Sequence, residues 1–250
     1  MTILNWEGIT LQMKISSSTK KTTATETKHS CEFCKRSFIK ESTLLTHICE
    51  YKHRWIERDK QGNRIGFQCW LQFYARHSAS KKQKTYEDFI KSAYYTAFAK
   101  FGTYCVEVNV LNVPRYVDYL LKEKIKIDTW ASDSNYNKFL IEYLQMEDPH
   151  DAIHRSVETC IDMSNDQHIE PNDVLRYGNR NRILYSITNG KISPWLLYQS
   201  ESGVKLLDEL DPEQVKLVYD YINPVKWAMK FAKDDKKVNE VKVLLKDLRY

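Results

Sequence analysis

The chain has 250 residues, 42% of them hydrophobic and 28% charged, with only 7 Gly and 6 Pro. This composition favours a packed, mainly helical protein over a β-rich or disordered chain. No run of about 18 apolar residues and no apolar N-terminal signal region occurs, so we expect no membrane span and no secretion. The net charge of +5 is uneven, because residues 1–84 hold 16 Lys/Arg against 7 Asp/Glu and residues 85–250 carry the remaining −4. Basic segments attract phosphates, so nucleic acid is the expected partner.

Residues 1–29 are rich in Ser, Thr and Lys, as in the run S-S-S-T-K-K-T-T. A segment of this composition buries too little apolar surface to order itself. We therefore predict a flexible basic arm over 1–29.

Residues 30–55 have the pattern of one C2H2-type zinc finger. Cys31 and Cys34 are two residues apart, twelve residues separate Cys34 from His47, and five separate His47 from His53. This spacing lets two thiolates and a helix-borne histidine face one tetrahedral ion.

The same stretch contains the small apolar core that a ββα finger needs, Phe38 and Leu44. A unit this small cannot fold on burial alone. Zinc binding supplies about 10–16 kcal/mol in finger peptides. The sequence therefore predicts a structural Zn²⁺ ion.

The fourth ligand is left open between Cys49 and His53. His53 fits the long end of the usual H-x3–5-H spacing. Cys49 follows His47 by two residues, which is about 200° of rotation in a regular helix and points it away from the metal. A helix that ends or tightens at His47 would present Cys49 instead.

The finger pattern also predicts which residues would contact the bases and phosphates of a nucleic acid. Numbering the helix back from His47 puts Lys40 at −1, Thr43 at 3 and Thr46 at 6, the positions that reach base edges in DNA-reading fingers. Four further residues are placed to contact phosphates: Lys35, Arg36, Lys52 and Arg54. One finger covers only about three base pairs. A protein-docking or purely structural finger is therefore the alternative.

A helical body is predicted over 56–250, with a division into 56–147 and 148–250 left open. Asp59 to Asn63 is predicted to be a turn, because Gly62 and Asn63 tolerate positive φ. Thr85 is predicted to cap a helix over 86–101 that ends at Gly102. The aromatic segment over 65–74 is interpreted as buried core, with a stacking surface for single strands as the alternative.

Five later helices are predicted to begin with proline, which is preorganised for the first helical position. Three of these prolines follow a cap residue: Ser193-Pro194, Asp211-Pro212 and Asn223-Pro224. The other two are Pro114 and Pro171. His150 and His154 are four residues apart, but no H-E-x-x-H pattern is present, so we expect an Asp-capped helix start there and no metal site.

Several runs together resemble uncharacterised zinc-finger proteins of T4-like tailed phages: C-E-F-C, H-I-C-E-Y-K-H-R-W, G-F-Q-C-W-L-Q-F-Y, Y-Y-T-A-F-A-K-F-G and K-I-S-P-W-L-L-Y. In those relatives the finger helix ends in a His-x-Cys pair, which favours Cys49 as the fourth ligand. The resemblance implies a phage protein that acts in the host cytoplasm, and it carries no established reaction.

No glycine-rich phosphate loop, nucleophile elbow or HNH-like arrangement occurs in the sequence. We therefore expect a non-enzymatic accessory or regulatory factor in phage replication or transcription. It would bind nucleic acid, with DNA favoured over RNA, and a protein partner through the helical body. The alternatives are a virion or assembly protein in which zinc is purely structural, and a nuclease with dispersed carboxylates.

Overall fold

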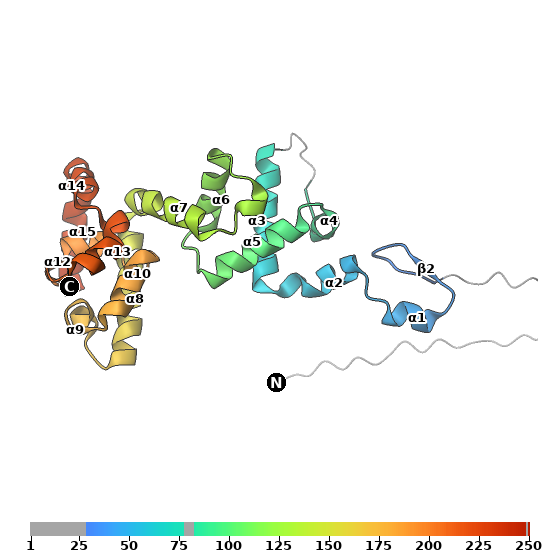
Figure 1. Ribbon diagram of the computed structural model, residues 1–250, viewed down its shortest axis with the longest axis horizontal. Helices are drawn as coiled ribbons and strands as arrows, with labels where there is room; N and C mark the ends of the chain where they lie inside the picture. The colour runs from blue at the N-terminus through green and yellow to red at the C-terminus, as the bar shows by residue number, and fades with distance from the viewer. Residues whose placement is uncertain (1–28, 78–82, 249) are drawn as a thin grey trace, which may run out of the picture. The chain divides into compact units, whose positions relative to one another are not determined.

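The computed structural model describes residues 29–77, 83–248 and 250 (Figure 1). The predicted basic arm therefore lies outside the described residues, except for His29. The described residues form two compact units, which divide between His53 and Arg54.

The first unit is a small ββα finger. Its strands β1 (His29–Ser30) and β2 (Ser37–Phe38) pair in antiparallel register, with His29 opposite Phe38. Helix α1 (Glu41–Thr46) follows the hairpin directly. The predicted ββα arrangement is confirmed.

The remaining described elements are all helical, and the predicted mainly α fold is confirmed. Helix α2 (Glu50–Ile56) contains the division between the two units. The α-helices that follow it are α3 (Gln61–His77), α4 (Tyr86–Lys91), α5 (Tyr95–Glu107), α6 (Val113–Lys122), α7 (Asp133–Met146), α8 (Pro149–Gln167), α9 (Val174–Tyr177), α10 (Arg180–Thr188), α11 (Pro194–Gln199), α12 (Glu201–Asp208), α13 (Pro212–Ile222), α14 (Pro224–Lys233) and α15 (Asp235–Asp247). Short 3-10 turns lie at Glu57–Asp59, Ile127–Thr129 and Pro171–Asp173.

Helices α3 and α5 cross at very close range because glycines lie on both (Figure 1). A Cβ atom on Gly102 would meet the backbone of Gly62 and Gly66, and one on Gly66 would meet the backbone of Phe98. The expected turn at Gly62 and the expected helix end at Gly102 are both wrong, since each glycine lies inside a helix. These glycines supply space for a neighbouring helix rather than positive φ.

The core next to this crossing is aromatic. Trp70, Phe89, Phe98, Phe101 and Trp130 are each almost completely buried. Their rings meet in tilted and edge-to-face pairs, such as Trp70 with Phe89 at 5.3 Å between centroids. The interpretation of the aromatic segment as core is thus supported by burial at its centre, and Cys69 is buried with it.

The cap predictions for the later helices are confirmed. Asp148, Ser193, Asp211 and Asn223 each accept a hydrogen bond from a backbone N–H in the first turn of the helix that follows. Each of these helices also has proline in that turn.

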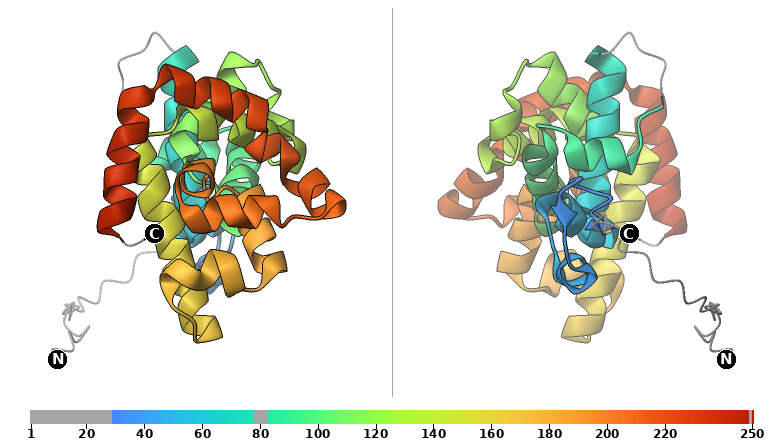
Figure 2. Two further views of the ribbon diagram at one scale, coloured as in Figure 1. Left: turned by 90° about the vertical axis from the view of Figure 1, so that its left-hand side faces the viewer. Right: turned by 90° about the vertical axis from the view of Figure 1, so that its right-hand side faces the viewer.

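The C-terminal half is organised around α8. Helix α15 lies alongside it, and α11 packs on it as well (Figure 2). Ile153, Cys160, Trp195, Leu196 and Leu245 supply part of the buried interior here. Across the described ranges, no helix combines the length and the apolar character that a bilayer crossing requires.

Candidate metal centre

The first two ligand candidates lie on a tight turn between the two finger strands. The Lys35 N–H donates to the Cys31 carbonyl at 2.8 Å, and the Cys31 N–H donates to the Arg36 carbonyl at 2.9 Å. Lys35 takes φ +60° to close this turn. The turn brings Cys31 and Cys34 to the same side of the backbone, as a metal-binding knuckle requires.

The other two candidates meet because α1 ends early. The last residue of α1 is Thr46, and His47 has the extended torsions φ −72° and ψ 120°. In extended backbone, residues two apart point to the same side. Cys49 therefore lies next to His47, and the 200° of helical rotation that would separate them does not apply.

Cys49 also lies directly before the next helix, α2. Its carbonyl accepts from the His53 N–H at 2.9 Å, and its sulfur accepts from the Lys52 N–H at 3.4 Å. The sulfur thus takes the place that a side-chain oxygen takes in an ordinary helix cap. This hydrogen bond orients the thiol and favours its thiolate form.

The four side chains form one compact cluster. The ligand atoms of Cys31, Cys34, His47 and Cys49 all lie within 4.8 Å of one another. Cys31 Sγ and Cys49 Sγ are 3.9 Å apart, and Cys34 Sγ and His47 Nε2 are 3.3 Å apart. Tetrahedral zinc with bonds of about 2.3 Å to sulfur and 2.0–2.1 Å to nitrogen requires separations of roughly 3.8 and 3.5 Å. The cluster therefore fits a tetrahedral ion of this size.

Local packing supports the cluster. Cys31 is 4% exposed, and the other three residues are half-buried. The ring of Phe38 lies 4.7 Å from the His47 ring, centroid to centroid, which holds the imidazole in place. Phe38 thus performs the core role that the sequence predicts for it.

The charge environment of the thiols differs from one to the next. A hydrogen bond from the Cys34 backbone N–H lowers the pKa of Cys31, against the effect of burial. Burial raises the pKa of Cys49, with the Lys52 N–H opposing it. A divalent cation would favour the thiolate at every one of these positions.

His53, the alternative fourth ligand, is not part of the cluster. It lies on the exposed side of α2, one turn after Cys49. The structure thus brings together three cysteines and one histidine. Of the two candidates for the fourth ligand that the spacing left open, Cys49 is the one that lies in the cluster.

The residues predicted to read bases are exposed. Lys40 immediately precedes α1, which begins at Glu41, in agreement with its predicted recognition position −1. Thr43 and Thr46 lie on the surface of this helix. The Thr46 hydroxyl donates to the backbone carbonyls of Ser42 and Thr43. Its oxygen keeps its acceptor capacity, so Thr46 offers a base an acceptor rather than a donor.

The residues predicted to contact phosphate divide into two groups. Lys35 and Arg36 are exposed on the knuckle, whereas Lys52 Nζ donates to the His47 carbonyl at 3.2 Å. Arg54 donates to the Ile90 carbonyl at 2.6 Å and lies over the Tyr95 ring at 4.3 Å, so it is used inside the helical body. Lys35, Arg36 and Lys40 are therefore the best-placed cations of the finger.

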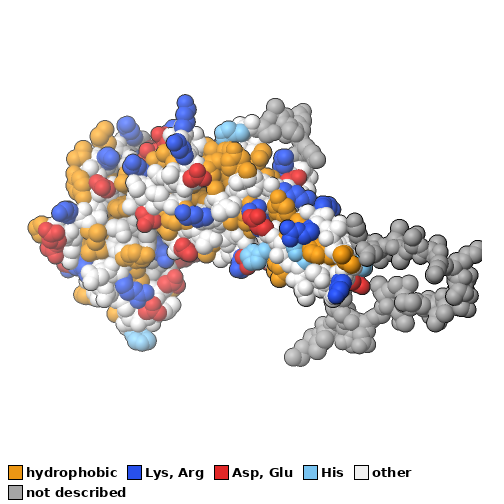
Figure 3. All heavy atoms as spheres, turned by 45° about the vertical axis from the view of Figure 1, so that its right-hand side comes forward, with side chains coloured by type: hydrophobic (Ala, Val, Ile, Leu, Met, Phe, Trp, Pro, Cys, Tyr) orange, Lys and Arg blue, Asp and Glu red, His pale blue; other side chains and the backbone are white. Residues whose placement is uncertain are grey.

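The sequence interpretation did not single out an apolar component of the finger surface. Ile39, Leu45 and Ile48 are 69%, 72% and 63% exposed. Figure 3 shows hydrophobic side chains beside Lys and Arg on the exposed surface of the finger. The signal was present in the sequence, because Leu45 and Ile48 lie outside the Phe38–Leu44 core positions of the finger pattern.

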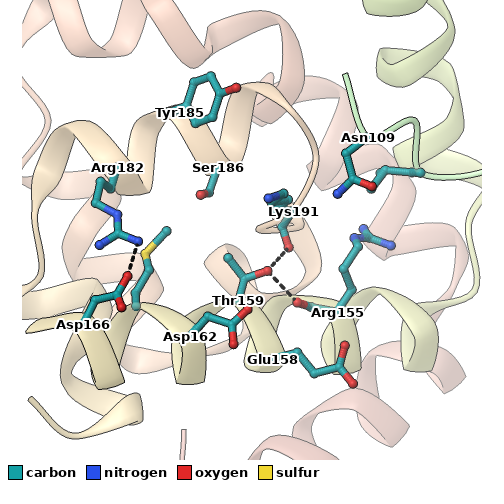
Figure 4. Close-up of a pocket in the computed structure, with 12 residues that line it drawn as sticks. Asn109, Arg155, Glu158, Thr159, Asp162, Asp166, Arg182, Tyr185, Ser186 and Lys191 are labelled. Atoms are coloured by element: carbon teal, nitrogen blue, oxygen red, sulfur yellow. Dashed lines mark hydrogen bonds and ion pairs between the residues drawn. The ribbon is translucent and has the colours of Figure 1, made fainter. Parts of the chain in front are cut away.

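The helical body has a separate pocket of about 550 Å³ along α8 and α10 (Figure 4). Two of its arginines are paired: Arg182 with Asp166 at 2.8 Å, and Arg155 with Glu147 at 2.7 Å. The Thr159 hydroxyl donates to a backbone carbonyl of its own helix at 2.8 Å. None of the twelve residues that line this pocket is His or Cys. His150 and His154 lie exposed on α8, consistent with an Asp148-capped helix start.

Comparison with known proteins adds no relative, since no protein-family model, curated protein or solved structure matches the chain. The features of this chain that bear on its function are therefore the metal cluster, its basic surroundings and the surface of the helical body.

Proposed function

We propose that this chain is a zinc-finger protein that binds nucleic acid, preferentially DNA. It would act in the host cytoplasm as a non-enzymatic accessory factor in phage replication or transcription. A protein partner would dock on its helical body. The phage context is supported by the sequence resemblance described above, and the nucleic-acid context by the finger and its charge.

The observation that carries the proposal is the cluster of Cys31, Cys34, His47 and Cys49 within a ββα unit. Its donor set of three sulfurs and one nitrogen matches structural zinc sites, which are closed and tetrahedral. The bound ion would supply folding energy to a unit too small to fold on burial alone. No vacant coordination position is needed for this role.

Charge and exposure support nucleic acid as the ligand of the folded finger. Lys35, Arg36 and Lys40 are exposed around the knuckle and the start of α1, within a segment of net charge +9 over residues 1–84. Neutralising phosphates with such residues releases counterions and makes binding weaken steeply with salt. Thr43 and Thr46 offer little base discrimination, so we expect weak sequence preference.

The test is a fluorescence-anisotropy titration of the full chain with duplex DNA, single-stranded DNA and RNA. It is carried out at about 50 and about 200 mM salt, because affinities that depend on phosphate contacts fall steeply over this range. An Arg36→Ala/Lys40→Ala variant should bind more weakly and lower the salt slope by about two. Lys216→Ala, which removes an exposed lysine of α13, serves as the control and should change neither quantity. Salt-independent binding, or an unchanged slope in the double variant, would contradict the proposal.

A second candidate function follows from the exposed Ile39, Leu45 and Ile48 side chains. Exposed apolar groups that gather into one patch are typical of protein-docking surfaces. If the finger docks a protein instead, none of the three nucleic acids binds. In a pull-down, the wild-type chain should then retain a phage or host protein, and the Leu45→Ser variant should not retain it.

A further inference from the structure

A second pocket of the helical body has the chemistry of a site for a basic side chain. It lies between α6 and α7, at the start of α8, and has a volume of about 470 Å³. This is within the range of about 300–1,000 Å³ that is usual for ligand pockets. We call it the α6–α7 pocket, and it belongs entirely to the second unit.

Three aromatic side chains line this pocket. Phe139 and Tyr143 are stacked, with centroids 5.3 Å apart and an interplanar angle of 28°. Tyr119 of α6 meets Phe139 at 5.6 Å. Phe139 is 3% exposed, whereas both tyrosines remain half-buried and reachable. The faces of such rings attract cations, and Arg most often.

Carboxylates lie on the α7–α8 side of the pocket. Glu142, Asp148 and Asp151 line it and are exposed. Glu142 of α7 and Tyr119 of α6 both line this pocket, and the charge of Glu142 adds to burial in raising the pKa of Tyr119. An aromatic surface and a carboxylate thus occur side by side, as recognition of a guanidinium requires.

Two other carboxylates at the pocket already have cations. Asp118 pairs with Arg76 at 2.7 Å, and Glu147 pairs with Arg155 at the same distance. The pocket also has cations on its α6 side, Arg115 and Lys122, which balance part of the negative charge.

The surrounding sequence is strongly acidic. Residues 128–167, which contain α7 and α8, hold nine Asp/Glu against two Lys/Arg, a net charge of −7. The α7–α8 side therefore stays negative after the internal pairs are counted. Met146 is 72% exposed at the end of α7 and adds an adaptable apolar contact at the rim.

We propose that the α6–α7 pocket binds an arginine side chain presented by a basic segment of a partner protein, with the guanidinium on the Tyr119–Tyr143 surface and paired with Glu142. This assigns the body a binding site distinct from the finger, and it does not depend on the nucleic-acid proposal. Arginine is preferred over lysine because its planar guanidinium stacks on rings and meets a carboxylate through two parallel hydrogen bonds.

The probe is a fluorescein-labelled peptide, Gly-Arg-Gly-Arg-Gly, titrated with the full chain at low salt and followed by anisotropy. In two comparison peptides, both arginines are replaced by lysine or by citrulline. The arginine peptide should bind most tightly and the lysine peptide more weakly. The citrulline peptide, which has the same shape without charge, should not bind.

Three variants locate the site. Glu142→Gln removes an exposed charge, and Tyr143→Leu removes the ring while keeping an apolar contact. Each should weaken binding by roughly three- to tenfold, the range that corresponds to one cation–π or charged contact. Asp162→Asn is the matched control, because it removes one exposed charge from the same acidic segment outside the pocket. It should change the Kd by less than about twofold, as expected for a screened charge at a distance.

Three outcomes would overturn the proposal. The first is the absence of arginine-peptide binding to the wild type. The second is equal binding of the citrulline peptide. The third is an equal loss in Asp162→Asn and Glu142→Gln, which would mean that the acidic segment attracts the peptide without a defined site. Glu142 is exposed, so its variant retains the fold and keeps the test decisive even if Tyr143→Leu is destabilised. Because no nucleic acid is present, each of these outcomes leaves the proposed function of the finger untouched.

Discussion

The buried ion pair between Glu147 and Arg155 gives the sharpest prediction about the helical body. The Glu147 side chain is 1% exposed, and its Oε2 lies 2.7 Å from Nη2 of Arg155. Its other oxygen accepts from the Ser193 hydroxyl at 2.9 Å. Arg155 also donates from Nε to the Gly190 carbonyl at 2.9 Å. The pair thus ties α8 to the connections before α8 and before α11.

We predict that Arg155→Met destabilises the protein by about 3 kcal/mol at pH 8. Removing one partner of a buried pair typically costs about 3–5 kcal/mol, because the other charge stays buried without compensation. The Arg155 side chain is 21% exposed, so solvent moderates the effect and the lower end of this range applies. The assay is urea unfolding followed by far-UV circular dichroism.

The cost should fall with pH. Burial raises the pKa of Glu147, and the positive charge of Arg155 opposes this rise. Without Arg155 the native pKa rises further, so folding favours the protonated carboxyl. The variant's stability deficit is therefore largest above the raised native pKa and shrinks as the pH falls through it. At pH 5 we expect a clearly smaller loss than at pH 8.

Two further variants complete this test. Arg155→Met/Glu147→Gln should be more stable than Arg155→Met alone, because the amide keeps the Ser193 hydrogen bond without a buried charge. Arg180→Met, which breaks a pair with the exposed Glu209, should cost under about 1 kcal/mol. Equal losses for Arg155→Met and Arg180→Met, or a loss independent of pH, would refute the reasoning.

Three other changes test the finger and the helix crossing. Gly102→Ala should destabilise the α3–α5 crossing by at least about 1–3 kcal/mol, because its Cβ meets the α3 backbone; urea unfolding measures this, with the exposed Ser134→Ala as the control. Lys35→Gly should tighten zinc binding by roughly five- to tenfold, since φ +60° costs a non-glycine residue about 1–2 kcal/mol; chelator competition measures the affinity, and Lys35→Ala should show no gain. Zinc removal by a chelator should abolish the finger's tertiary contacts, while thermal unfolding of the helical body stays unchanged by circular dichroism; loss of the body's transition would show that the two units depend on each other.

The sequence predicted the elements whose causes are local. Caps and prolines at Ser193-Pro194, Asp211-Pro212 and Asn223-Pro224 act within one helical turn, so each start could be placed from a few residues. The finger's strands and helix likewise follow from the spacing of its ligands and core residues. The helical fold class followed from composition and periodicity.

The errors have a common physical origin. Gly62 and Gly102 were interpreted through their own backbone freedom, whereas their role is set by a helix some 40 positions away in the chain. A sequence read locally contains no sign of that approach. The Cys49 alternative depended on where α1 ends, and a shift of one residue in a helix end decides which ligand faces the metal. The α6–α7 pocket joins residues from three elements and has no linear motif.

The measurement that tests the metal centre most directly is X-ray absorption at the zinc edge, applied to the wild type, Cys49→Ser and His53→Gln. We predict three sulfurs at about 2.3 Å and one nitrogen at about 2.0–2.1 Å in the wild type. His53→Gln should leave this shell unchanged, and Cys49→Ser should lose one sulfur. A wild-type shell of two sulfurs and two nitrogens, with one nitrogen lost in His53→Gln, would contradict the Cys3His site.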